Sequence, residues 1–271
     1  MKSYTQVLSE KLKRAGRDCV QSRKVDRVEM LAKTIKALTE EASATGTFWT
    51  FAEAVLKLNL SVSEQLLLSA LWGYLAKNRK EMQLSDFWQL CQEIEESALD
   101  ALESIPIWIY ESDGKVVLSP VLFGWLEGEM PELPMGVSLK LPKPEVRYGL
   151  NELIQDTEQI FQAAEQSDFQ GILCIEGEKG SGRCFCMEQI LADRELSILM
   201  IDGDAFRGNA REINACILCA ALYEAFVCVL LGKEIREKLL ADLSGCFRFY
   251  GIIKEDKREL QEQPEAVVYT R

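Results

Sequence analysis

Apolar residues in the first half of the chain recur every three or four positions, which is the period of amphipathic helices. Residues 4–40 have this spacing and predict one or two helices with charged outer faces. Further helices are predicted over residues 48–58 and 64–77. Ser61 and Glu64 have the spacing of a capping box, in which each side chain accepts the other residue's backbone N–H. We therefore expect the leucine-rich helix to begin at this pair.

A β-rich stretch follows the helical region. After a helix predicted over residues 84–102, two short apolar runs flank Asp113-Gly114, a dipeptide typical of tight hairpin turns. A short helix is predicted over residues 120–126. Helices followed by a hairpin are the element order of a winged helix. We therefore assign residues 1–40 to N-terminal helices and residues 41–130 to a winged-helix-like domain.

The pattern changes again in the second half of the chain. Four prolines predict an extended linker over residues 131–147, and a helix is expected over residues 150–166. Short apolar runs then alternate with helical segments. The predicted strands are residues 171–175, 197–201, 226–231, 246–252 and 266–269, with helices over 184–192, 210–225 and 235–243. This alternation predicts an α/β core over residues 148–271, with a parallel five-stranded sheet covered by helices on both faces.

Composition excludes several kinds of chemistry. The chain has no histidine, so a Ser-His-Asp triad, a Cys-His pair and a His-ligated zinc site are ruled out. The start of the chain lacks the apolar segment of a signal peptide, and no apolar run is long enough to span a membrane. We therefore expect a cytoplasmic protein with no membrane contact. Its nine cysteines are expected to be reduced and mostly buried.

Two cysteine pairs have the close spacing that metal and redox sites use. Cys216 and Cys219 lie in an apolar helical pattern, and neither they nor Cys184 and Cys186 have a second pair at zinc-knuckle spacing. We expect no metal there. Nucleic acid is not expected as a partner either, because residues 41–135 carry five Lys or Arg against fifteen Asp or Glu, which repels phosphates.

The most informative segment is a glycine-rich run that follows the first predicted strand. Gly177, four further residues, Gly182, Arg183 and Cys184 lie between that strand and a predicted helix, as in a Walker A loop. Glycines let backbone amides surround a phosphate, and the helix N-terminus adds partial positive charge. The pattern requires Lys and then Ser or Thr where this chain has Arg183 and Cys184. Guanidinium is wider than ammonium, and sulfur is a poor Mg²⁺ ligand.

The order of elements over residues 48–271 resembles the winged-helix-bearing branch of the AAA+ ATPases. That resemblance implies strands ordered 5-1-4-3-2 and a nucleotide contacted by Gly177, Gly180, Ser181, Gly182, Arg183 and Cys184. It implies an ATP or ADP ligand with Mg²⁺, although the two departures in the loop weaken the case for Mg²⁺. The family's helical lid, with its second sensor, has no counterpart in the sequence.

The remaining catalytic parts expected from this family are incomplete. At the Walker B position, residues 227–234 lack the metal-anchoring Asp, and Glu234 is the candidate water-activating carboxylate in a shifted register. Asp202 and Asp204 resemble a Walker B motif but fall on the second predicted strand, so we interpret them as a decoy. The first sensor has no convincing match at residues 249–251.

Three functions remain open from the sequence. The leading hypothesis is a nucleotide-binding, AAA+-like protein with weak or no hydrolysis that works in a homo- or hetero-oligomeric protein assembly. The first alternative is a pseudo-ATPase scaffold that binds no nucleotide. The second is an active ATPase with atypical metal ligands, such as Asp202 or Asp204.

Overall fold

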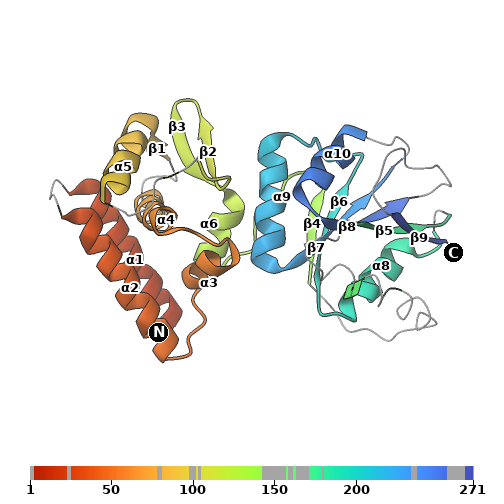
Figure 1. Cartoon of the computed structure of the whole chain (residues 1–271), viewed down its shortest axis with the longest axis horizontal. Coiled ribbons are helices and arrows are strands. Elements are labelled where there is room, and N and C mark those ends of the chain that lie inside the picture. The colour runs from red at the N-terminus through yellow and green to blue at the C-terminus, as the bar shows by residue number, and fades with distance from the viewer. Residues whose placement is uncertain are drawn as a thin grey trace. The chain divides into compact units, whose positions relative to one another are not determined.

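The chain divides into two units, which we call the N-unit (Met1–Glu132) and the C-unit (Leu133–Arg271) and describe separately (Figure 1). The computed structural model describes residues 3–22, 26–77, 81–97, 102, 105–141, 157, 161–162, 171–178, 180–232, 237–254 and 266–270. None of the helices within these ranges is long and apolar enough to cross a bilayer.

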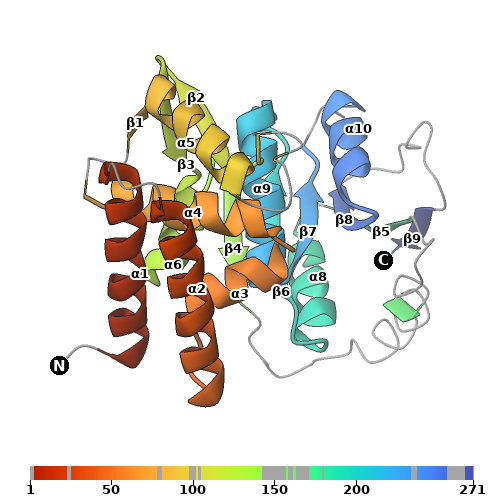
Figure 2. The same cartoon turned by 60° about the vertical axis from the view of Figure 1, so that its left-hand side comes forward.

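The N-unit begins with two helices, α1 (Tyr4–Gln21) and α2 (Arg27–Ala44), which lie side by side (Figure 2). Both pack against α4 (Val62–Leu75), which is apolar on nearly all sides and almost entirely buried. The capping box at its start is confirmed: Glu64 N–H donates to Ser61 Oγ at 3.3 Å, and Ser61 N–H donates to Glu64 Oε2 at 2.9 Å. The N-terminal helices thus share one unit with the segment that follows them.

Helices α1 and α4 cross in backbone contact at two glycines. A Cβ on Gly16 would lie 2.0 Å from the carbonyl oxygen of Ser69, and a Cβ on Gly73 would lie 2.3 Å from that of Lys13. No side chain fits at either position, because real atoms do not approach so closely. The crossing therefore depends on glycine from both helices.

The β-rich part of the N-unit is a three-stranded antiparallel sheet in the order β1-β3-β2. Its members are β1 (Met82–Gln83), β2 (Ile109–Ser112) and β3 (Lys115–Leu118). The remaining helices of the unit are α5 (Leu84–Ser97), which packs on this sheet, and α3 (Thr50–Lys57) and α6 (Pro120–Glu127), which contact each other. The predicted hairpin is confirmed. Asp113 and Gly114 have φ angles of 52° and 71°, as a two-residue type I′ turn requires.

The C-unit is an α/β structure built on a six-stranded sheet in the order β4-β6-β7-β8-β5-β9. Its strands are β4 (Val137–Lys140), β5 (Gly171–Glu176), β6 (Ser197–Asp202), β7 (Ala225–Leu230), β8 (Phe249–Lys254) and β9 (Ala266–Thr270). The last five are the predicted strands, and they are parallel. If these five strands are numbered 1 to 5 along the chain, their order across the sheet, from β9 to β6, is 5-1-4-3-2.

The sixth strand corrects the sequence analysis. The predicted linker, residues 131–147, contains β4, which pairs antiparallel with β6 at the edge of the sheet. Val137 and Leu139 are half-buried while Ser138 and Lys140 are exposed, which is the alternation of an edge strand. Lys140 forms an ion pair with Glu188 of the helix that covers this face. The strand is short and flanked by prolines, so the sequence signal of a linker outweighed it.

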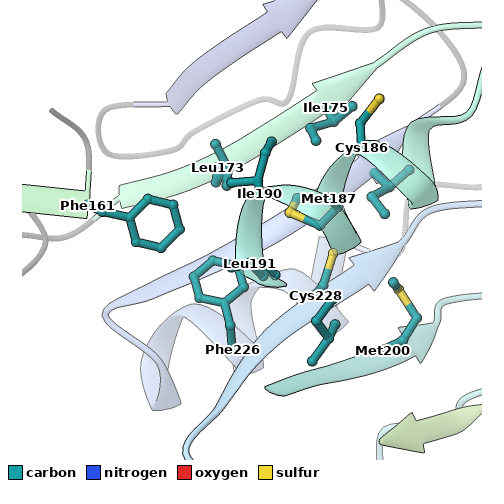
Figure 3. Packing of buried hydrophobic residues seen from close by; sticks show 12 residues of the cluster. Phe161, Leu173, Ile175, Cys186, Met187, Ile190, Leu191, Met200, Phe226 and Cys228 are labelled. Atoms are coloured by element: carbon teal, nitrogen blue, oxygen red, sulfur yellow. The ribbon is translucent and has the colours of Figure 1, made fainter. Parts of the chain in front are cut away.

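Helices cover both faces of the C-unit sheet: α8 (Arg183–Ala192) packs on one, and α9 (Ala210–Tyr223) and α10 (Glu237–Cys246) cover the other (Figure 1). Figure 3 shows Met187 and Ile190 of α8 lying against Leu173 and Cys228 of the sheet. The helix predicted over residues 150–166 falls mainly outside the described residues. Within that range, residues 157, 161 and 162 are described, and they are helical.

Strand β8 begins three residues later than predicted, because α10 continues to Cys246. This shift moves the carboxyl end of β8 to Lys254. Residues 249–251, where the sequence offered no convincing first sensor, begin the strand and do not follow it.

Candidate functional site

The glycine-rich segment connects β5 to α8 as the sequence predicted. We call residues 177–182 the glycine loop; residue 179 lies outside the described part of the chain. Inside the loop, the N–H of Ser181 donates to the carbonyl of Glu178 at 3.1 Å and closes a turn. Helix α8 then begins with a bond of 2.8 Å from the N–H of Cys186 to the carbonyl of Gly182. Strand, loop and helix are thus continuous.

The backbone of the loop requires glycine at two positions. Gly180 and Gly182 have φ angles of 88° and 82°, in the left-handed region that residues other than glycine rarely adopt. At Gly177, a Cβ would lie 2.8 Å from Ser181 Oγ, so a side chain there would require the Ser181 hydroxyl to rotate away. Left-handed residues next to right-handed ones turn successive N–H groups toward one side, which suits an anion.

The first turn of α8 adds amide groups to this side of the loop. The first N–H groups of any helix lack an intrahelical acceptor, and the helix dipole makes that end partly positive. In α8 these groups belong to Arg183, Cys184 and Phe185. They follow Gly182 directly, so these N–H groups lie at the end of the glycine loop.

Two predicted site residues open the helix, and the structure gives them different surroundings. Arg183 is buried, and a Cβ on Gly177 would lie 3.4 Å from its Cγ and Cδ atoms. Its aliphatic stem therefore folds back along the start of the loop. Cys184 is half-buried and packs against the hydrophobic cluster beneath α8. Its sulfur therefore contributes to packing in the place where the resemblance expects a metal-binding hydroxyl.

Three buried charged residues lie at or next to the glycine loop. Among the residues described, the charged side chains that are buried are Glu176, Arg183 and Lys254, with 6%, 8% and 8% of their surface exposed. Lys254 Nζ lies 3.3 Å from Glu176 Oε2. Burying charge is costly unless the group is paired or has a function, so three buried charges at or next to one loop are informative.

The sheet register explains why this ion pair forms. Glu176 and Lys254 are the last residues of the neighbouring parallel strands β5 and β8, and they lie directly opposite each other. The carboxyl ends of parallel strands share one edge, where the loop also begins. Neither residue was predicted from the sequence as part of the site. The available signal was a charged residue at the end of each of two apolar strands.

Asp202 ends β6 and Asp204 lies two residues beyond it, at the same edge of the sheet. Asp202 Oδ1 accepts hydrogen bonds from the N–H groups of Asp204 at 3.0 Å and Ala205 at 3.3 Å, so this carboxylate stabilises its own turn. The Asp204 carboxylate lies against Gly232, two residues after the end of β7. Glu234, the predicted catalytic carboxylate, lies outside the described residues.

The cysteines do not form a reactive cluster. All nine are free thiols, and seven are buried. Burial raises the pKa of Cys216 and of Cys219 to about 12, so both remain protonated at neutral pH. Across the described residues, no group of three or more Cys, Asp or Glu side chains has the arrangement of a metal site.

Comparisons of this chain with protein-family models, with curated proteins and with solved structures found no match. The geometry at the carboxyl edge of the C-unit sheet is therefore the basis for a functional proposal.

Proposed function

We propose that the C-unit binds a nucleoside phosphate, ATP or ADP, in the glycine loop and hydrolyses it slowly or not at all. The observation that carries this proposal is the set of buried charges at the loop. Arg183 and Lys254 place two buried cationic side chains at or next to the loop, and the phosphates of a nucleotide are anionic. The N–H groups at the start of α8 are suited to the same anion.

The sheet topology supports the same ligand class. Nucleotides bind at the carboxyl edge of open parallel sheets, where the strand order changes direction. Strand β5, which leads into the glycine loop, lies between β8 and β9 at such a change. The order 5-1-4-3-2 is also the order implied by the resemblance to AAA+ ATPases, and on this basis we propose an AAA+-like core.

Weak hydrolysis is proposed because metal anchorage is poor. Phosphoryl transfer depends on positioned Mg²⁺ and charge neutralisation. Cys184 offers sulfur where a hydroxyl is expected, and its side chain packs against the core. Asp202 is engaged in its own turn. The proposed protein is therefore a nucleotide-responsive component of an assembly.

The N-unit supports a role in protein binding. Its sheet order, β1-β3-β2 with a hairpin between β2 and β3, is compatible with the winged helix that we propose. Helix α5 carries exposed Asp86, Glu95 and Glu96 and has no Lys or Arg. An acidic helix repels DNA phosphates, so we propose a protein partner for this unit.

Thermal denaturation with ATP or ADP, with and without Mg²⁺, tests the proposal when phosphate release is measured in parallel. We expect both nucleotides to raise the melting temperature, with little release. Saturation at one hundred times the Kd corresponds to about 2.7 kcal/mol of added stability. An unchanged melting temperature with every ligand would contradict nucleotide binding and favour the pseudo-ATPase scaffold.

A second candidate, an active ATPase with an atypical metal ligand, is favoured by the position of Asp204. Its exposed carboxylate reaches the end of β7, where the resemblance expects a Walker B carboxylate. Sustained phosphate release that requires Mg²⁺ would support this candidate over the first.

A further inference from the structure

We infer that Lys254 is a phosphate-binding residue whose charge is held by Glu176 while the site is empty, and that a bound phosphate competes with Glu176 for it. This inference rests on the proposed function and adds two residues to that site. The pair lies at the base of the glycine loop, with Lys254 Nζ 3.3 Å from Glu176 Oε2.

The position of the pair is the first argument. Glu176 is followed directly by Gly177, the first residue of the loop, and Lys254 lies opposite Glu176 on the adjacent strand. Adjacent strands are separated by about 4.8 Å, so Lys254 ends one strand spacing from the start of the loop. A lysine side chain is long enough to move from a carboxylate to a phosphate within that distance.

The imperfect pairing of Glu176 is the second argument. Its Oε1 atom is buried and accepts no hydrogen bond from the described residues. A buried carboxylate that uses one oxygen is a weak holder of its cation, because its desolvation is not fully compensated. The pair is therefore suited to exchange, in which Lys254 trades one anionic partner for another.

The third argument is that Arg183 does not supply the ammonium group that a Walker A lysine would place at the loop. The stem of Arg183 folds back over Gly177, and its wide guanidinium replaces the slim ammonium of a Walker A lysine. Lys254, the last residue of β8, places an ammonium group at the same edge of the sheet. Glu176 would then lower affinity for phosphate, both by repulsion and by holding Lys254.

Two variants are expected to change phosphate affinity in opposite directions. A merely structural ion pair would not give opposite effects. Glu176→Gln removes the competing charge and is expected to tighten ATP, ADP and inorganic phosphate binding by about tenfold. The double variant Glu176→Gln with Lys254→Gln removes the cation as well and is expected to bind more weakly than wild type. Isothermal titration calorimetry measures each Kd, and circular dichroism verifies folding.

Glu188→Gln is the matched control for charge. It removes one negative charge from the same unit, at the ion pair with Lys140, where 30% of the Glu188 side chain is exposed. We expect its affinity to stay near that of wild type. A gain equal to that of Glu176→Gln would show that net charge, and not this pair, controls binding, and would overturn the inference.

The remaining outcomes also decide the matter. Unchanged or weaker binding by Glu176→Gln would overturn the inference, as would wild-type affinity in the double variant. Loss of folding in both variants would show that the pair is structural and also overturn it. If wild type binds none of the three probes, the proposed function itself fails, which is a distinguishable result.

Discussion

The carboxylate of Asp204 fills the space beside Gly232. A Cβ on residue 232 would lie 1.9 Å from Asp204 Oδ2 and 2.1 Å from Oδ1, so the carboxylate occupies the place of a side chain at the end of β7. A carboxylate from the turn after one strand thereby reaches the end of the neighbouring strand. This relationship makes Asp204, and not Asp202, the candidate metal ligand.

Asp204→Asn tests that assignment. We expect any additional rise in melting temperature that Mg²⁺ gives with ATP to disappear, while the rise with ATP alone persists. The reason is that an amide is a much poorer Mg²⁺ ligand than a carboxylate. Asp202→Asn is the matched control, since the amide oxygen still accepts the two turn hydrogen bonds. A Mg²⁺ effect that survives in Asp204→Asn would exclude Asp204 as a ligand.

Gly73→Ala should destabilise the N-unit by about 3 kcal/mol, because overpacking against rigid backbone costs at the upper end of the usual range. A Cβ there would lie 2.3 Å from the carbonyl oxygen of Lys13, and only separation of α1 from α4 relieves the clash. All five tryptophans lie in the N-unit, so urea unfolding followed by tryptophan fluorescence reports on this unit. Gly245→Ala has open space around it in the C-unit and should leave that transition unchanged.

The carboxylate of Glu127, in α6, links α6 to α1 and α4 through hydrogen bonds. It accepts hydrogen bonds from Lys13 Nζ at 2.9 and 3.1 Å and from Trp72 Nε1 at 2.7 Å. Glu127→Ala should cost about 2 kcal/mol, since both donors lose their acceptor, and Glu127→Gln about 1 kcal/mol. Chemical denaturation measures both values. Equal costs for the two variants would argue that the charge of Glu127 contributes little.

The raised pKa values of two buried thiols predict how the free energy of unfolding changes at high pH. Burial raises the pKa of Cys216 and Cys219 from 9.0 to about 12, so the folded protein keeps protons that the unfolded chain releases. Their contribution is fully present below pH 9 and is lost as pH rises from about 9 toward 12, by up to about 1.4 kcal/mol per thiol per pH unit.

The measurement compares urea unfolding of wild type and of the variant Cys216→Ala with Cys219→Ala at pH 8 and pH 10, under reducing conditions. The variant should lose less stability between the two pH values. Parallel losses would mean that other groups dominate alkaline unfolding.

Local features were predictable because each depends on residues a few positions apart. The capping box at Ser61 and Glu64 and the turn at Asp113 and Gly114 need no distant partner, and both form as predicted. The continuous strand, loop and helix around residues 177–182 follow for the same reason. Strand β4 was missed because its partner, β6, lies some sixty residues further along the chain.

In the candidate site, too, local features were predictable from the sequence and pairings between distant residues were not. Sequence spacing indicated the glycine loop, because glycines and a following helix are local signals. It did not indicate Lys254, because only the parallel register of β5 and β8 brings that residue opposite Glu176. Nor did it show that Cys184 packs into the core while Arg183 folds back along the loop.

The sequence by itself determined most of the helices, the five parallel strands of the C-unit, the hairpin and the loop, since hydrophobic period and turn chemistry act within a few residues. The tertiary structure alone decided which charges meet at the edge of the sheet. Strand order and register are set by the packing of the whole sheet, and they place Glu176 beside Lys254 and Asp204 beside Gly232.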